Sequence, residues 1–189
     1  MRGCPKKMDN NKHKVKIVNI VVSSSLEHDI PLEKMAATLS NTEYNPEQFP
    51  GLVIRIKEPK TTALIFSSGN IVCTGAKTLA EVDQSIEKII KYLEKLDIKI
   101  TIKPKITIQN MVASGSIDMD LNLNMLAMKL SNTEYEPEQF PGLVYKISGK
   151  VSATFLLFSN GKIVCTGTKG EDQVHVALDE LKERLSKVK

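Results

Sequence analysis

The sequence predicts an α+β fold made of two copies of one unit, each with helices on one side of an antiparallel sheet. The first observation is a repeat: NTEYNPEQFPGLV begins at Asn41, and NTEYEPEQFPGLV begins 91 residues later at Asn132. The two stretches differ at one position, Asn45 in the first and Glu136 in the second. The second observation is that each copy combines short β-branched segments with a long amphipathic pattern. Two copies are too few for a solenoid, so we expect two halves related by a pseudo-twofold axis.

The composition is that of a globular chain in a reducing compartment. Of the 189 residues, 41% are hydrophobic and 25% are charged, and the formal net charge is +4. No apolar run approaches ~20 residues, and no apolar segment follows the basic head, so neither a membrane span nor a secretory signal is expected. The three cysteines lack CxxC spacing, which argues against a zinc site. We expect a flexible basic tail over residues 1–14, a first repeat over 15–100 and a second over 101–189.

Each unit is expected to contain a strand, a short helix, three or four strands and a long helix. In the first copy, residues 17–22 are β-branched and indicate a strand, and Pro31 opens the short helix. Residues 52–56, 62–66 and 71–76 indicate three further strands, the last two joined by a hairpin at Ser-Gly.

The long helix is predicted to begin at a capping box formed by Thr78 and Glu81. Its apolar residues recur at helical spacing, which predicts one buried stripe. The stripe in the first copy is Val82, Ile86, Ile89 and Leu93, and in the second copy it is Val174, Leu178, Leu181 and Leu185.

Both faces of the predicted sheet carry apolar side chains. Strict alternation places Asn70, Val72, Thr74 and Ala76 on one face of their strand and Cys73 on the other. Two helices per unit can cover only one face, so the second face is expected to be an interaction surface. The alternative is that both faces are buried in a larger sandwich or a dimer.

Four of the five phenylalanines occupy unusual places. Phe49 and Phe140 directly precede Pro-Gly, where a turn ordinarily has polar residues. Phe66 and Phe158 stand at hairpin ends. Each repeat therefore places two aromatic side chains at strand ends, outside the helix-facing core. A structural role at the core edge is the alternative, and it must hold in both repeats.

These stretches resemble the conserved core of the TATA-box-binding protein family. The resemblance covers about residues 15–185. Its motifs are NTEYNPEQFPGLVIRIKEPKTTALIFSSGNIVCTGAK in the first repeat and IQNMVASG, YEPEQFPGLVYKI and FSNGKIVCTGTK in the second. It implies a saddle with a curved, ten-stranded antiparallel sheet and four helices on the convex side. It also implies a general transcription factor that binds the minor groove of TATA promoter DNA, kinks it, and recruits transcription factor B and RNA polymerase.

The resemblance assigns roles to matching positions. Wedges that enter base steps are implied for the pairs Phe49 with Phe66 and Phe140 with Phe158. Base hydrogen bonds are implied for Asn19 and Asn110, with Thr74 and Thr166 beside them. The implied apolar floor is Val21, Leu64, Val72, Val112, Leu156 and Val164. The implied phosphate contacts are Arg55, Lys77, Lys146, Lys162 and Lys169. The implied contacts with transcription factor B are Glu136 and Glu138.

One position departs from the family pattern. Asn70 stands where the family usually has Lys, opposite Lys162 in the second repeat, which puts one phosphate contact in doubt. No metal or cofactor is expected, and the apolar face would allow two free copies to pair. The short head and the likeness of the repeats resemble archaeal members, for which the compartment is the cytoplasm; a eukaryotic member would be nuclear.

Two other functional classes are alternatives to a DNA-binding transcription factor. An enzyme is disfavoured because the three histidines are scattered and no Gly-rich phosphate loop occurs. A non-catalytic protein of the same fold could instead bind an RNA-containing duplex or a protein on its sheet. Binding to A·T-rich duplex, A-form hybrid and single strand separates these possibilities.

Overall fold

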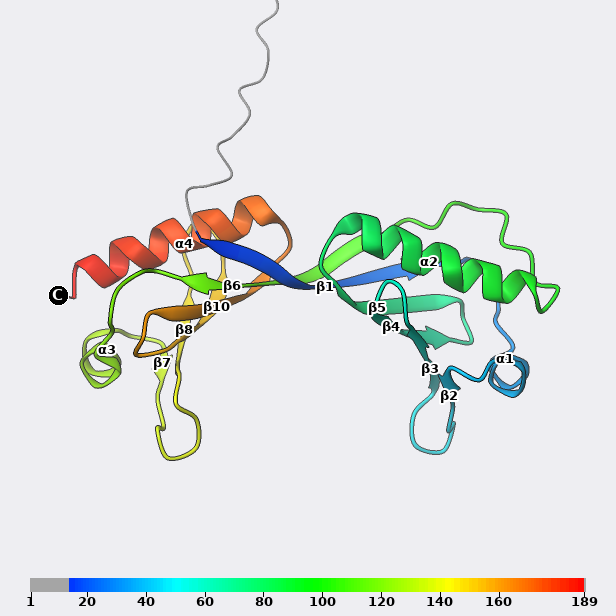
Figure 1. The fold of residues 1–189 in the computed structure, drawn as a ribbon, viewed down its shortest axis with the longest axis horizontal. Helices are drawn as coiled ribbons and strands as arrows, with labels where there is room; N and C mark the ends of the chain where they lie inside the picture. The colour runs from blue at the N-terminus through cyan, green and yellow to red at the C-terminus, as the bar shows by residue number, and fades with distance from the viewer. Residues whose placement is uncertain (1–13, 189) are drawn as a thin grey trace, which may run out of the picture. The chain divides into compact units, whose positions relative to one another are not determined.

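The computed structural model describes residues 14–188, so residues 1–13 of the predicted tail, including Cys4, lie outside them. Within this range the two repeats contain the same elements in the same order (Figure 1). The first repeat consists of β1 (Val15–Ser25), α1 (Leu32–Thr38), β2 (Thr42–Glu43), β3 (Gly51–Ile56), β4 (Thr61–Phe66), β5 (Asn70–Ala76) and α2 (Leu79–Glu94). The second consists of β6 (Thr107–Ser116), α3 (Leu123–Lys129), β7 (Thr133–Glu134), β8 (Leu143–Ile147), β9 (Ala153–Leu157), β10 (Lys162–Thr168) and α4 (Glu171–Ser186).

Residues 14–188 thus form ten strands and four helices, which confirms the predicted α+β fold. The strands are hydrogen-bonded in the order β2-β3-β4-β5-β1-β6-β10-β9-β8-β7. Neighbours β2 to β5, and β7 to β10, pair antiparallel. The chain divides into two compact units, one formed by Ile17–Val112 and the other by the rest of the described chain.

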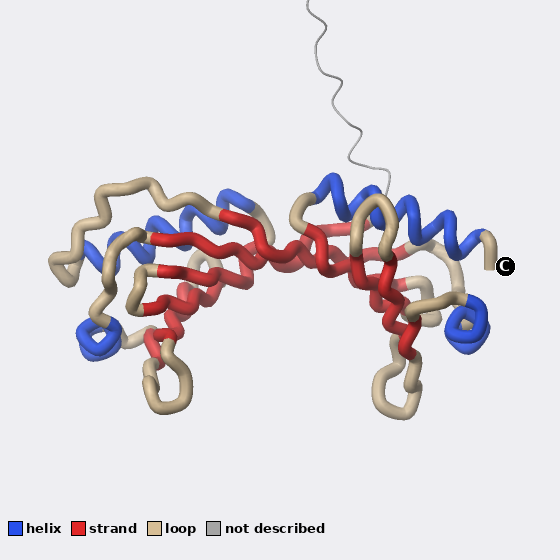
Figure 2. The backbone as a smooth tube through the Cα atoms, turned by 180° about the vertical axis from the view of Figure 1, so that it is seen from behind, coloured by secondary structure: helices blue, strands red, loops and turns tan. Residues whose placement is uncertain are grey.

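In both units one long helix covers one face of the strands (Figure 2). α2 packs on β5 and buries the predicted stripe Val82, Ile86, Ile89 and Leu93. α4 packs on β10 and buries Val174, Leu178, Leu181 and Leu185. The opposed strand faces contribute buried residues such as Ile54, Ile65 and Cys73. The buried stripes of the two long helices were therefore predicted correctly from periodicity.

The start of α2 differs in detail from the predicted capping box. The Thr78 hydroxyl accepts from the Glu81 N–H at 3.2 Å, as expected. The Glu81 carboxylate, however, accepts from the N–H of Lys77 at 2.6 Å rather than from the N–H of Thr78. In α4 the N-cap is Gly170, with no side-chain cap. There the Gln173 side chain accepts from the N–H of Lys169 at 2.9 Å.

The prediction that Ala76 shares a face with Val72 is wrong. Ala76 is fully buried, whereas Gly75 is exposed and has φ +98°. The register explains the change: Ile20 pairs with Ala76 and Val22 with Cys73, so β5 has one more residue than β1 over this interval. This extra residue is a β-bulge, and it reverses the alternation beyond it.

No helix among residues 14–188 combines the length and the apolar character that a bilayer span requires.

Candidate nucleic-acid interface

The face of each unit that the long helix leaves uncovered carries the predicted apolar floor. Val21, Leu64 and Val72 are half-exposed in the unit Ile17–Val112, and Leu64 pairs directly with Val72. In the other unit Leu156 pairs with Val164, and both are half-exposed. The predicted floor residue Val112 is likewise half-exposed.

Two residues of the floor were not predicted from the sequence. Val53 is half-exposed and pairs with Leu64, and Val144 is half-exposed and pairs with Leu156. Both follow directly on the repeated Pro-Gly-Leu, so alternation from Leu64 across the neighbouring strand could have found them. The floor therefore also extends onto β3 in one unit and onto β8 in the other.

The structure brings together the two phenylalanines of each predicted pair. The ring centroids of Phe49 and Phe66 are 5.9 Å apart with an interplanar angle of 63°. Those of Phe140 and Phe158 are 5.9 Å apart at 67°. Edge-to-face contact of this kind is favourable between aromatic rings. Phe49 and Phe140 each remain 41% exposed, so neither pair is part of the helix-facing core.

A glycine beneath each pair allows this approach. A Cβ atom built on Gly51 would lie 2.6 Å from Phe49 Cε1 and 3.1 Å from Phe66 Cε1. At Gly142 the corresponding distances to Phe140 and Phe158 are 2.7 and 3.1 Å. Any larger residue would displace the rings, which explains in steric terms why the Phe-Pro-Gly stretch occurs in both copies.

Asn19 is held by two hydrogen bonds to its amide oxygen. Gly75 N–H donates to Asn19 Oδ1 at 2.7 Å, and the Thr74 hydroxyl donates to it at 3.2 Å. These bonds define which end of the amide is oxygen and which is the NH₂ donor. Asn110 and Thr166, their counterparts in the second repeat, are both half-exposed.

The five predicted phosphate-contacting cations are all exposed, but two of them are already paired with carboxylates. Arg55 forms an ion pair with Glu43, and Lys146 forms one with Glu134. The backbones at Lys77 and Lys169 are fixed by the helix-start hydrogen bonds described above. Asn70 is exposed at the position equivalent to Lys162, so the first repeat has an uncharged side chain where the second has a cation.

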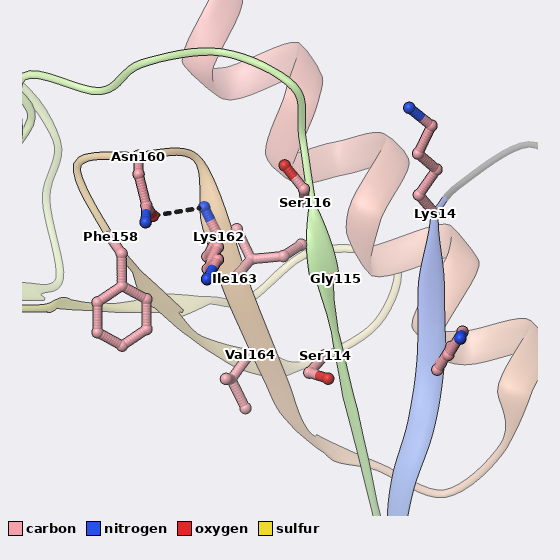
Figure 3. Close-up of a pocket in the computed structure, with 10 residues that line it drawn as sticks. Lys14, Ser114, Gly115, Ser116, Phe158, Asn160, Lys162, Ile163 and Val164 are labelled. Carbon is pink, nitrogen blue, oxygen red and sulfur yellow. Dashed lines mark hydrogen bonds between the residues drawn. The ribbon is translucent and has the colours of Figure 1, made fainter.

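A cavity of about 570 Å³ lies beside Phe158. Its lining includes a predicted wedge, a predicted phosphate contact and a predicted floor residue: Phe158, Lys162 and Val164 (Figure 3). The Lys162 N–H donates to Asn160 Oδ1 at 3.1 Å, which fixes the hairpin that precedes β10. Lys14 also lines the cavity, and it pairs with Asp118 at 3.1 Å, which lowers the pKa of that carboxyl.

The loops that carry Phe49 and Phe140 project beyond the strands they join (Figure 1). In loop 44–50, the N–H groups of Gln48 and Phe49 donate to the Asn45 carbonyl, and Glu47 N–H donates to Asn45 Oδ1 at 3.2 Å. Loop 135–142 repeats the two backbone bonds to Glu136. Glu136 and Glu138 are exposed there.

The two cysteines among residues 14–188 lie in the buried core. Cys73 and Cys165 are buried under the long helices, and burial raises the pKa of Cys165 to about 11 and also raises that of Cys73. Both thiols are therefore protonated at neutral pH and act as small hydrophobic side chains. No group of three His, Cys, Asp or Glu side chains in this part of the chain is close enough to hold a metal ion.

Comparison with known proteins agrees with this geometry. The family model described as "Transcription factor TFIID (or TATA-binding protein, TBP)" matches residues 14–96 and 105–188, one match for each repeat. The chain belongs to the TATA-binding protein family. Membership confirms the predicted resemblance and places the chain among transcription factors.

Individual relatives of this family match over nearly the whole chain. The TATA-box-binding protein of Picrophilus torridus is 49% identical over 177 residues, which are 93% of this chain and 96% of that protein. That of Methanosphaera stadtmanae is 49% identical over 171 residues, covering 90% and 93%. The solved structure of Methanococcus jannaschii TBP superposes with a TM-score of 0.86 at 45% identity, covering 92% of this chain and 99% of that one.

Proposed function

We propose that this chain is a general transcription factor that binds the minor groove of A·T-rich TATA promoter DNA and kinks it with its phenylalanine pairs. The observation that carries the proposal is the same in both repeats: an uncovered apolar floor with an edge-to-face phenylalanine pair at its end. The names of the archaeal relatives, TATA-box-binding protein, support the choice of DNA.

The floor suits a minor groove without G·C pairs. In that groove A·T and T·A present similar acceptors, while G·C adds a protruding amino group. Valine and leucine side chains fit flat A·T edges and would clash with that amino group. The NH₂ group of Asn19, oriented by Thr74 and Gly75, would donate to the base acceptors. Such a floor reads base composition more than sequence order.

The phenylalanine pairs supply the deformation. As is known for this family, apolar wedges in the minor groove unstack base steps at a cost of a few kcal/mol each and open the groove to more protein contact. Pyrimidine–purine steps such as TA unstack most readily, which favours TATA sequences. The five predicted cations would hold the phosphates on either side of the widened groove.

The partner surface is the loop 135–142. We infer that Glu136 and Glu138 bind basic side chains of transcription factor B, which in turn brings RNA polymerase to the promoter. Glu136 replaces Asn45, whose side chain accepts a hydrogen bond within its own loop. The substitution therefore adds a carboxylate to one loop of an otherwise repeated pair.

The proposal is tested with the full chain and labelled duplexes of equal length. Fluorescence anisotropy should show tighter binding to a TATA duplex than to a G·C-rich duplex, an A-form hybrid or a single strand. Fluorescence energy transfer between the duplex ends should report bending. A Phe140→Ala, Phe158→Ala double variant should lose bending at one end, because no wedge remains there, while circular dichroism stays unchanged.

A second double variant, Phe49→Ala with Phe66→Ala, is the matched control for the opposite end. Full bending by either folded variant would contradict the wedge assignment. Preference for the hybrid or the single strand would instead favour an RNA-directed function for the same face.

A further inference from the structure

Each repeat places a carboxylate against one of its phosphate-binding cations. Arg55 Nη2 donates to both carboxylate oxygens of Glu43, at 3.1 and 3.0 Å. Lys146 Nζ donates to Glu134 Oε1 at 2.8 Å. The same arrangement thus occurs twice, with arginine in one repeat and lysine in the other.

Both pairs lie on the uncovered face, beside the floor. Glu43 is paired in register with Val53, and Arg55 is two residues further along β3, so all three side chains share one face. Val53 pairs in turn with the floor residue Leu64. Glu134, Val144 and Lys146 repeat the arrangement beside Leu156. A duplex seated on the floor would meet these carboxylates as well as the cations.

Stability does not account for the pairs. The side chains of Arg55 and Glu43 are 61% and 68% exposed, and those of Lys146 and Glu134 are 57% and 69% exposed. Ion pairs as exposed as these contribute little to folding, typically below about 1 kcal/mol. Their position beside the floor points to binding instead.

We propose that Glu43 and Glu134 are built-in competitors of DNA phosphate, which limit the contribution of Arg55 and Lys146 to binding. The inference rests on the proposed DNA-binding function. A phosphate that approaches Arg55 or Lys146 must displace a carboxylate that is already bound. The displaced carboxylate then stays beside a polyanion and takes up a cation from solution.

This exchange has a measurable signature in salt. Each phosphate neutralised by a free cation contributes about −0.9 to the slope of log K against log [salt], through counterion release. Cation uptake by Glu43 or Glu134 offsets that release, so the wild-type slope is shallower than its number of cations implies. The contribution of phosphate contacts to affinity is therefore reduced equally for all DNA sequences. Discrimination between DNA sequences is left to the apolar floor.

The test compares Glu43→Gln, Glu134→Gln and the double variant with the wild-type full chain. Gln keeps the size of the side chain and removes its charge. Anisotropy titrations over a range of KCl, with TATA and G·C-rich duplexes, give each slope. We expect the double variant to steepen the slope by about 1 to 2, and to bind both duplexes several-fold more tightly at about 0.1 M salt, where screening is incomplete.

Glu183→Gln on α4 is the matched control. Glu183 forms an equally exposed ion pair with Lys187 at 2.7 Å, on a helix that covers the opposite sheet face. Its loss should leave slope and affinity unchanged. An equal effect of Glu183→Gln, an unchanged slope in the double variant, or weaker DNA binding by it would each overturn the inference.

A double-mutant cycle isolates the competition at one pair. Glu43→Gln should have a smaller effect in an Arg55→Gln background than in the wild type, because no cation is left to release; equal effects overturn the inference. The wild-type preference for TATA over G·C-rich duplex tests the proposed function separately, so either idea can fail while the other stands.

Discussion

At the scale of single residues, the first repeat has a buried polar contact that the second repeat lacks. Thr61 and Ser85 are both buried, and their hydroxyl oxygens lie 2.8 Å apart, within hydrogen-bond distance. Ser85 Oγ also donates to the Glu81 carbonyl at 2.7 Å, and the Thr61 hydroxyl reaches the Pro59 carbonyl at 3.4 Å. The equivalent residues of the second repeat are Ala153 and Ala177, also buried. The first repeat therefore fills this buried site with a hydrogen-bonded pair of hydroxyl groups, and the second repeat fills it with small apolar side chains.

This difference predicts a non-additive effect on stability. Ser85→Ala removes the closest hydrogen-bond partner of the buried Thr61 hydroxyl and should lower the free energy of unfolding by about 1–3 kcal/mol. Thr61→Ala with Ser85→Ala should cost less than the sum of the single changes, because the second repeat tolerates that pair. Urea unfolding midpoints measure all three, and strictly additive losses would rule out the coupling.

At the scale of elements, we expect the projecting loops to give the bound protein its direction, because their charge differs between the two repeats. A·T and T·A pairs are nearly equivalent in the minor groove, so two similar floors cannot strongly fix the direction of transcription. Loops 44–50 and 135–142 share their backbone hydrogen bonds and differ at Asn45 and Glu136. The second loop therefore presents an additional charge in the same backbone geometry.

We expect Glu136→Arg with Glu138→Arg to leave TATA binding close to normal while recruitment of transcription factor B falls. Charge pairs at a solvent-exposed rim act mainly on partner choice and association rate. Glu47→Arg, the control in the first loop, should have little effect on recruitment. Gel-shift titration of the complex of this protein, TATA duplex and transcription factor B measures recruitment. Normal recruitment by the double variant would mean that transcription factor B binds another surface of the protein.

At the scale of the whole molecule, the same structural features occur once in each unit. Both units have a buried helix stripe, a half-exposed apolar floor, an edge-to-face phenylalanine pair over a glycine, and a carboxylate–cation pair. Because the two floors have the same construction, equivalent changes in them should have similar effects on DNA binding.

Val72→Lys and Val164→Lys should each weaken TATA binding at least about tenfold, since an ammonium group on the floor must lose water against base edges. Lys182→Ala on α4, which covers the other sheet face, should change binding far less. Anisotropy with a TATA duplex measures all three variants. If the α4 change is the most damaging, the floor has been assigned to the wrong face.

The duplication, the element order and the position of two phenylalanines per repeat at strand ends could all be predicted from the sequence, whereas the pairing of these phenylalanines was implied by the family resemblance. The elements are encoded locally: period-2 and period-3.6 apolar patterns specify strands and helices, and turn residues separate them. The stripes of α2 and α4 are buried as predicted for the same reason. Alternation also placed Leu64 and Val72 on one face correctly, since no irregularity lies between them and the hairpin.

Tertiary structure alone decided the features that depend on register. Ala76 lies on the buried face because a bulge at Gly75 adds a residue to one strand, which alternation along that strand cannot reveal. Glu43 meets Arg55 because β2 and β3 pair so that residues twelve positions apart become diagonal neighbours. Strand pairing is a non-local choice made by the packing of the whole sheet, so contacts across it follow from the fold and not from any single stretch of sequence.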